Sequence, residues 1–377
     1  MARQARHRRL GSLIRQRPWL VPLMIAAVAL PLTTIMIIWW GGDDRGGQAD
    51  RGPGTASEQP GDIGTADQRP PSTSASPTTS ATATPGPSTP GARPGGVWRP
   101  APATRWQWQI VDKVTTPFQN VAMYDVDLTD AVPAATTVTV TGFGQVTWPK
   151  GANAGIVERL HAAGKVVICY LDTGAYESYE PDAKLFPGKP GWSAGDPASD
   201  VIGATSGWDN EYWLDIRPTQ RAKFAPIMWA RFDLARTIGC DGVEPDQNNP
   251  VGNNPGPPIT LADEKSWYLE VARAAHARGL SVGMKNGIEV TDADTVAAFD
   301  WNLNEQCFFF EECDVLAGFI KAGKAVFQVE YTEDWADKGF TTPAALASSN
   351  QVCAAARPRQ FATLIKRQVP DASYVAC

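Results

Sequence analysis

Acidic side chains close several short apolar runs within residues 98–377 of the chain. Asp127, Asp172, Asp246 and Glu305 each stand at the end of such a run. Two carboxylates on either side of a glycosidic bond are sufficient to hydrolyse it, one as acid and the other as nucleophile or base. The acids therefore indicate carboxylate chemistry, with glycoside hydrolysis as a reaction that needs no further group.

Histidine chemistry has little support. The chain has three histidines, and His7 belongs to an arginine-rich N-terminal tail. His161 and His276 lie just before glycines that end helices, where they complement the negative end of a helix. A Ser/His/Asp triad and a histidine metal site are therefore poorly supported. We expect no metal and no cofactor, with a carboxylate-only magnesium or calcium site as the open alternative.

A repeated pattern supplies the elements that would position the acids. Four times, a helix-like stretch is followed by a glycine, a short apolar run and polar residues; the glycines are Gly164, Gly239, Gly279 and Gly323. A glycine at this place favours the left-handed conformation that ends a helix. The short apolar runs are typical of strands buried on both faces of a parallel sheet.

Together with less regular runs, the pattern predicts eight strands, most of them separated by helices. They are Val121–Asp127, Val166–Asp172, Tyr212–Ile216, Gly242–Asp246, Ser281–Asn286, Asp300–Glu305, Ala325–Tyr331 and Phe361–Lys366. This rhythm predicts an α/β fold with a parallel sheet, and eight units favour a (β/α)8 TIM barrel. An open doubly wound sheet is the alternative, although no G-x-G-x-x-G follows the first strand.

In such a barrel the reacting groups gather at the carboxyl ends of the strands. The substrate-binding candidates at these ends are Tyr124, Asp125, Asp127, Tyr170, Asp172, Asp215, Glu244, Lys285, Asn286, Glu330 and Tyr331. Alternation places Glu244 and Asp246 on one face of their strand, and spacing alone does not rank Asp246 above Glu244. Six tryptophans are either sugar-stacking or core residues: Trp106, Trp108, Trp148, Trp208, Trp213 and Trp335.

At these residues the chain resembles the endo-α-1,4-polygalactosaminidase family, glycoside hydrolase family 114. The resemblance extends over residues 105–377, and its motifs follow one another in order. They are Trp106–Gln109, Tyr124–Leu128, Val167–Tyr170, Glu211–Arg217, Gly242–Asp246, Gly279–Asn286, Asn304–Cys307 and Lys324–Phe327.

The resemblance implies a (β/α)8 hydrolase that acts on α-1,4-linked galactosamine polymers without a cofactor. It further implies a catalytic pair, with Asp246 as nucleophile and Glu305 as general acid/base by analogy with related barrels. Two stretches depart from the family pattern: Gln247–Pro250, where a further aspartate and glycine are usual, and Asp172–Gly174, where serine or alanine often stands. Both lie at the rim, where they bear on substrate and cleavage pattern.

All six cysteines follow the first hundred residues. Six cysteines allow fifteen full pairings, among which we choose Cys307–Cys313 and Cys353–Cys377. The family resemblance makes the same two bridges plausible. Cys169 and Cys240 lie in or beside apolar strand-like runs and are expected to be buried free thiols.

The first 97 residues predict attachment to a membrane. Residues 1–17 carry six arginines and no acid, and residues 18–40 are uncharged and almost wholly apolar. A helix of this length spans the roughly 30 Å of a hydrocarbon core, and the basic flank keeps its start in the cytoplasm. Residues 41–97, rich in Pro, Ser, Thr and Gly, predict a disordered linker. The catalytic domain at 98–377 is then extracellular, or secreted if residues 18–40 are instead a cleaved signal peptide.

The net charge of the chain narrows the range of binding partners. The whole chain carries −6 and its first 97 residues carry +4, so residues 98–377 carry −10. This balance argues against nucleic acid and suits a cationic or amino-sugar polysaccharide, although acidity also serves solubility. Two alternatives to a galactosamine hydrolase stay open: a glycan hydrolase with another amino-sugar specificity, and a barrel that binds polysaccharide without cutting it.

Overall fold

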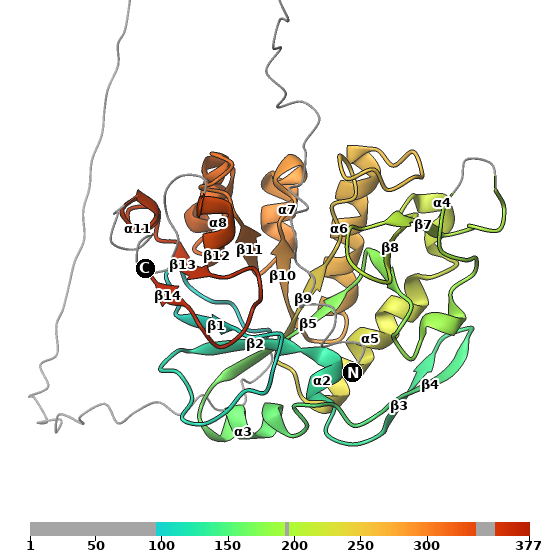
Figure 1. Ribbon diagram of the computed structural model, residues 1–377, viewed down its shortest axis with the longest axis horizontal. Coiled ribbons are helices and arrows are strands. Elements are labelled where there is room, and N and C mark those ends of the chain that lie inside the picture. Colours follow the sequence, from blue (N-terminus) through green and yellow to red (C-terminus); the bar gives the residue numbers. More distant parts are fainter. Residues whose placement is uncertain (1–95, 193–195, 337–350) are drawn as a thin grey trace, which may run out of the picture. The chain divides into compact units, whose positions relative to one another are not determined.

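The computed structural model describes residues 96–192, 196–336 and 351–377 (Figure 1). Its centre is a curled sheet whose strands follow the order β1-β2-β5-β9-β10-β11-β12-β13-β14. The pairings from β1 to β13 are all parallel, and β14 pairs antiparallel to β13. The strands are β1 Trp106–Trp108, β2 Met123–Asp127, β5 Val166–Asp172, β9 Gly242–Asp246, β10 Ser281–Lys285, β11 Trp301–Glu305, β12 Val326–Tyr331, β13 Ala362–Lys366 and β14 Val375–Ala376.

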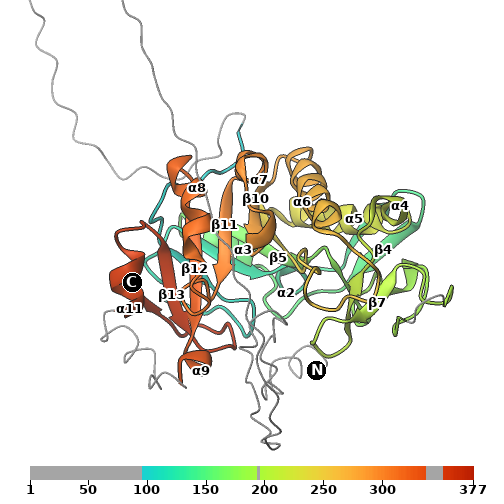
Figure 2. The same ribbon diagram turned by 90° about the horizontal axis from the view of Figure 1, so that it is seen from above.

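Helices cover the outer side of this sheet. Figures 1 and 2 show α5, α6, α7 and α8 following one another along it. The longer helices are α3 Ile156–Ala162, α5 Ala225–Ile238, α6 Leu261–His276, α7 Ala293–Ala298, α8 Ala317–Lys321 and α11 Gln351–Ala356. The short ones are α2 Leu128–Ala131, α4 Pro218–Arg221, α9 Thr332–Trp335, η1 Ala183–Leu185, η2 Ile288–Val290 and η3 Cys313–Leu316. The four predicted helix-ending glycines are confirmed, because Gly164, Gly239, Gly279 and Gly323 all have a positive φ between 70° and 94°.

The prediction of Tyr212–Ile216 as a strand of the main sheet was wrong. These residues overlap β8 (Glu211–Leu214), which pairs antiparallel with β6 (Ala175–Glu177) and β7 (Ile202–Thr205). Because β6 begins just after β5, this small sheet is an insertion between β5 and α5. The eighth parallel strand is instead β1, which has only three residues. A hairpin of β3 (Thr136–Val140) and β4 (Gly144–Trp148) precedes α3.

The two edges of the curled sheet approach each other through isolated hydrogen bonds. The indole N–H of Trp106, on β1, donates to the carbonyl of Ala362, on β13, over 2.8 Å. The backbone N–H of Ala103 donates to the carbonyl of Gln360 over 3.1 Å. The predicted eight-unit architecture is thus present as eight parallel strands wound around a common interior.

Alternate residues of the parallel strands point into that interior, and the strand register groups them in layers of four from alternate strands. The interior nearest the amino-terminal ends of the strands is apolar, with Trp106, Met123, Ile168, Trp301 and Phe327 in one buried cluster. The next layer holds Asp125, Glu244, Leu303 and Leu364. Above it lie Trp108, Tyr170, Lys285 and Val329, and at the mouth Asp127, Asp246, Glu305 and Lys366.

The segment before β1 packs against the amino-terminal ends of the strands. The ring of Trp98 stacks on that of Phe327, with centroids 6.3 Å apart and planes 8° apart. The carbonyl of Trp98 accepts a hydrogen bond of 2.6 Å from Ser281, at the start of β10. Arg99 forms an ion pair of 3.0 Å with Asp300, just before β11. The chain therefore enters the domain at the amino-terminal ends of the strands, opposite their carboxyl ends.

Three disulfides link cysteines of the described residues. Cys307–Cys313 and Cys353–Cys377 are the expected bridges. The third, Cys169–Cys240, shows that the expectation of free thiols for these two residues was wrong. Cys169 lies on the helix-facing side of β5, and Cys240 directly precedes β9, the neighbouring strand.

The predicted cytoplasmic tail (1–17), membrane anchor (18–40) and nearly all of the linker (41–97) lie outside the described residues. Within the described ranges, every helix is too short or too polar to span a bilayer. The domain boundaries given above therefore stay predictions.

Candidate active site

Lys285, at the end of β10, lies at the centre of a cluster of carboxylates. Its ammonium is 2.7 Å from Glu244 Oε1, 3.0 Å from Asp246 Oδ2 and 3.5 Å from Glu305 Oε2. Burial opposes the charge of this side chain, which is only 1% exposed. The three carboxylates outweigh burial and raise the pKa of Lys285 well above its usual value. A permanent ammonium on β10 thus connects the acids of β9 and β11, the strands on either side of it.

Asp246 is the acid of β9 that reaches the surface of the mouth. Its Oδ2 also accepts a hydrogen bond of 3.2 Å from the Tyr170 hydroxyl, and its Oδ1 accepts one of 2.6 Å from the backbone N–H of Gln247. Its side chain is 14% exposed, whereas that of Glu244 is completely buried. Of these two acids, only Asp246 is placed to meet a substrate.

Glu305, at the end of β11, is the other accessible acid, with its side chain 20% exposed. Its Oε2 accepts a hydrogen bond of 3.0 Å from the amide of Asn286, whose Oδ1 accepts the backbone N–H of Glu305 over 2.9 Å. The hydroxyl of Tyr331 contacts Oε1. Burial, and next the charge of Glu305, raise the pKa of Tyr331 well above its usual value. The phenol therefore keeps its proton and remains a donor.

The chain turns sharply after each of these three charged residues. Gln247, Asn286 and Gln306, which follow Asp246, Lys285 and Glu305, have φ values of 60°, 51° and 67°. Left-handed backbone at a residue other than glycine costs on the order of 1 kcal/mol. The fold tolerates this strain at three neighbouring strand ends, which is common at functional sites.

Trp108, considered from the sequence only as a sugar-stacking or core residue, contacts the acid cluster directly. Its indole N–H donates to Glu244 Oε2 over 2.9 Å, and its ring lies 4.9 Å from Lys285 Nζ. Tyr170 places a second ring 5.6 Å from the same ammonium. Five of the six tryptophans considered for sugar stacking are buried core residues, and only Trp208 is partly exposed.

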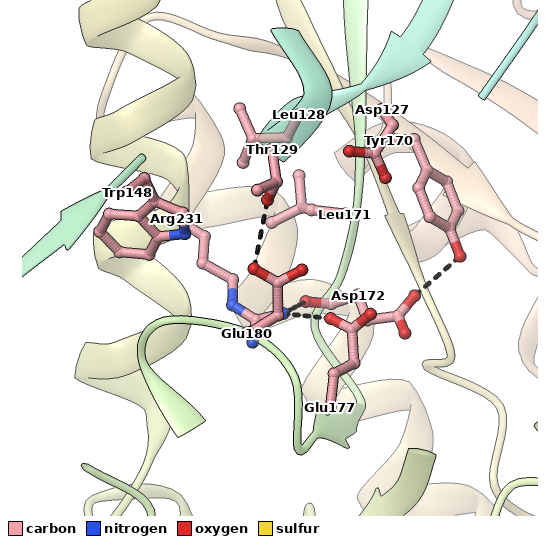
Figure 3. Close-up of a pocket in the computed structure, with 10 residues that line it drawn as sticks. All are labelled: Asp127, Leu128, Thr129, Trp148, Tyr170, Leu171, Asp172, Glu177, Glu180 and Arg231. Carbon is pink, nitrogen blue, oxygen red and sulfur yellow. Dashed lines mark hydrogen bonds and ion pairs between the residues drawn. The ribbon is translucent and has the colours of Figure 1, made fainter. Parts of the chain in front are cut away.

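A second group of acids adjoins the first, in the pocket drawn in Figure 3. The hydroxyl of Tyr170 donates to Asp172 over 2.9 Å and so connects the pocket with Asp246. Arg231, on α5, forms a buried ion pair of 2.7 Å with Glu177. The lining residues are Asp127, Leu128, Thr129, Trp148, Tyr170, Leu171, Asp172, Glu177, Glu180 and Arg231. Glu177 and Glu180 come from the insertion, and sequence patterns gave no sign of their place here.

Carboxylate oxygens of Asp172, Glu177 and Glu211 lie within 4.8 Å of one another, close enough to hold a cation. Each of these acids also accepts a hydrogen bond from a protein donor. The donors are Tyr170, Arg231 and Ser206, respectively. Each acid of this grouping therefore has a protein partner.

Three of the predicted substrate-binding residues lie away from the cluster. Tyr124 belongs to the core between sheet and helices. Asp215 forms an ion pair of 2.6 Å with Arg217, beyond the end of β8. Glu330 alternates out of the interior and accepts a hydrogen bond of 2.7 Å from Trp335. Burial raises the pKa of Glu330 to about 7.

The two departures from the family pattern are in contact with each other. The hydroxyl of Thr173 donates to Asn248 Oδ1 over 2.8 Å, and the N–H of Gly174 donates to the carbonyl of Asp246 over 3.2 Å. A Cβ on Gly174 would lie 1.8 Å from the carbonyl oxygen of Gln247. The loops after β5 and β9 are thus fitted to each other, so each departure accommodates the other.

The histidines do not join the site. His161 lies 2.9 Å from Asp241, and His276 lies 2.8 Å from Asp300. Both aspartates directly precede strands, at the end of the sheet opposite the carboxylate cluster. The hydrogen bond that Asp241 accepts from the ring raises the pKa of His161.

Eight parallel strands with two accessible carboxylates at their carboxyl ends form an arrangement suited to glycoside hydrolysis, and the match to a family model of glycoside hydrolases shows that the chain belongs to this class of enzyme. The family model of glycoside hydrolase family GH114 matches residues 87–377, and the chain belongs to this family.

The solved structures that are similar to this chain include the following two. The Aspergillus fumigatus protein Ega3, solved in complex with galactosamine, is 31% identical, with 76% of this chain and 100% of that chain covered and a TM-score of 0.59. The glycoside hydrolase domain of PelA from Pseudomonas aeruginosa is 13% identical, with 72% and 98% covered and a TM-score of 0.46. No curated protein matched the sequence.

Proposed function

We propose that this chain is an extracellular, endo-acting hydrolase of α-1,4-linked galactosamine polymers, with Asp246 and Glu305 as its catalytic pair. The observation that carries the proposal is the placement of two accessible carboxylates around the ammonium of Lys285, at the carboxyl ends of β9 and β11. Membership of family GH114 and the likeness to Ega3, which was solved with galactosamine, support an amino-sugar substrate.

The spacing of the pair favours retention of configuration. Since Lys285 Nζ lies 3.0 Å from Asp246 Oδ2 and 3.5 Å from Glu305 Oε2, these two oxygens are at most about 6.5 Å apart. Retaining enzymes place their carboxyls about 5–5.5 Å apart, and inverting ones roughly 6.5–9.5 Å apart.

The reaction then has two steps. Asp246 attacks the anomeric carbon while Glu305 gives its proton to the leaving glycosidic oxygen, which forms a glycosyl ester and frees one chain end. Glu305 next takes a proton from water, whose oxygen attacks the anomeric carbon and releases Asp246. Hydrogen bonds from Tyr170 and Gln247 orient Asp246, and those of Asn286 orient Glu305.

The acids beside the pair suit a cationic sugar. Asp127, Asp172, Glu177 and Glu180 line the pocket that Tyr170 connects to Asp246. A concentration of negative charge in a concave site attracts ammonium groups and is screened by salt. De-N-acetylated polygalactosamine carries such groups, whereas the fully acetylated polymer does not.

Reducing ends released from the two polymers test the function directly. We expect the chain to release them from de-N-acetylated galactosamine polymer, in fragments of several sugars rather than single residues. If neither polymer releases reducing ends, the proposed substrate is refuted. If another amino-sugar polymer releases them instead, the specificity is for that polymer.

Salt tests the role of the acidic pocket. We expect kcat/KM on the cationic polymer to fall as ionic strength rises from low to physiological, because salt screens the attraction, while any activity on the neutral polymer changes little. Asp127→Asn should weaken this dependence without stopping the reaction, because asparagine also caps α2, where Asp127 accepts the N–H of Asp130. An equal salt response for both polymers would show that the acidic residues do not attract the substrate and serve solubility only.

A further inference from the structure

Asp125 and Glu244 lie in one layer of the interior, directly beneath Lys285, and both side chains are fully buried. In the described part of the chain, no N–H or O–H group donates to either oxygen of Asp125. The strand register places the carboxyl of Glu244 in the same layer, on β9. A buried carboxyl that accepts no hydrogen bond and lies in one layer with a second buried carboxyl is favoured in its protonated form.

The other contacts of Glu244 place that proton on Asp125. Glu244 Oε1 accepts from the ammonium of Lys285 over 2.7 Å, and Oε2 accepts from the indole of Trp108 over 2.9 Å. Both oxygens of Glu244 are therefore acceptors. Burial, and next the charge of Glu244, raise the pKa of Asp125 well above its usual value. Burial raises the pKa of Glu244 to about 7, with Lys285 opposing the rise.

We propose that Asp125 is a positioning residue that holds a proton toward Glu244, and that this buried acid pair fixes Lys285 between Asp246 and Glu305. The inference rests on the proposed function, in which Asp246 and Glu305 perform the reaction. With Asp125 neutral, the ammonium is shared between Glu244 below it and the two accessible acids above it. An ionised Asp125 would add a second buried negative charge and draw the ammonium away from the mouth.

Titratable groups face the acid pair from the neighbouring strands. They are Tyr170 on β5, Asp246 on β9, Lys285 on β10, Glu305 on β11 and Tyr331 on β12. In the layer of the pair itself, the other two side chains are Leu303 and Leu364, which do not titrate. A pH response of the pair therefore has to be isolated by substitution at Asp125.

Two substitutions distinguish the role of the Asp125 proton from the role of the side chain's volume. Asp125→Asn keeps the shape and a permanent donor toward Glu244, and we expect kcat within about threefold of wild type at mildly acidic pH. Asp125→Leu removes the donor. We expect kcat to fall about tenfold or more, because Lys285 and the two accessible acids would no longer be held in place, with KM little changed. Equal loss of kcat in both variants would overturn the positioning role.

Stability against pH gives a readout that needs no substrate. A carboxyl whose pKa is raised by folding keeps its proton in the native state, so wild-type stability declines as pH rises from about 4 through that raised pKa. Asp125→Asn lacks this titration, and its thermal midpoint should decline less over the same range. Parallel curves for the two proteins would contradict the inference even if the enzyme is active.

Infrared spectroscopy keeps the inference testable if the variants fold poorly. With carbon-13 in the aspartate carboxyls alone, the wild-type chain should show the band of a protonated aspartate at neutral pH. Buried glutamates do not contribute to this isotope-shifted band. Absence of the band would overturn the inference, and its presence in a chain that hydrolyses no galactosamine polymer would leave the acid pair standing while the proposed function fails.

Discussion

Lys285 connects the two accessible acids of the mouth to the buried acid below them. Its ammonium is within 3.5 Å of Asp246, Glu244 and Glu305. Removing one acid of the mouth therefore leaves the lysine with other carboxylate partners. The charge of the buried ammonium stays compensated, so variants of the pair can lose activity without losing the fold.

We predict that Asp246→Asn and Glu305→Gln each lower kcat by about a thousandfold or more, because either half of the pair is needed for the transition state. Thermal midpoints should stay close to that of the wild type. Asp215→Asn is the matched control, since Asp215 pairs with Arg217 away from the cluster, and it should retain activity. Substantial turnover by either catalytic variant would move the assignment to another acid, with Glu244 and Asp172 as the next candidates.

The limits of prediction differ from residue to residue in the site. Family motifs and strand alternation were sufficient to select Asp246, Glu305 and Lys285 as neighbours. Spacing alone did not rank Asp246 over Glu244; the family resemblance favoured Asp246, and the exposure of the two side chains, which depends on how deep each lies in the interior, favours the same choice. The part played by Trp108 could not be predicted, because its strand of three residues leaves no periodic pattern.

At the scale of elements, the bridge Cys169–Cys240 joins the strand β5 to the approach to β9 across 71 residues. The chain between them contains the whole insertion and α5. In the chain-entropy account a crosslink stabilises by restricting the unfolded state, and more so for longer loops. The bridge Cys307–Cys313 closes a separation of only six residues, so it serves as an internal comparison.

We predict that Cys169→Ala with Cys240→Ala lowers the free energy of unfolding by about 4 kcal/mol, and that Cys307→Ala with Cys313→Ala lowers it by about 2 kcal/mol. Urea unfolding of the two double variants and the wild type measures both losses. A larger loss from the short bridge would show that local packing, rather than loop length, decides their contributions.

Seven of the eight predicted strands belong to the main sheet, because buried parallel strands leave short apolar runs, which in four cases follow a helix-ending glycine. The run at 212–216 carries the same local signal but pairs with β6 and β7. Periodicity reports that a segment is extended and buried, and it does not report the partner. Contacts between distant segments, such as the one between Thr173 and Asn248, are likewise absent from any local pattern.

At the scale of the whole molecule, attachment to a membrane remains a prediction from residues 1–97. We expect the full chain to fractionate with membranes and residues 98–377 to be soluble alone, because residues 18–40 are apolar behind a basic flank. Membrane flotation followed by N-terminal sequencing checks this. Recovery of only soluble protein beginning near Leu30 would identify the segment as a cleaved signal.

Trp98 contacts the amino-terminal ends of the strands, so the chain enters the domain at the end opposite the candidate active site. The first described residues of the chain lie at the amino-terminal ends of the strands, where Trp98 stacks on Phe327. The carboxylates lie at the other end. An affinity tag, a surface linkage or a fused carbohydrate-binding module can therefore be joined upstream while the open end stays clear for a long polymer, so immobilised enzyme should retain its rate on large substrates.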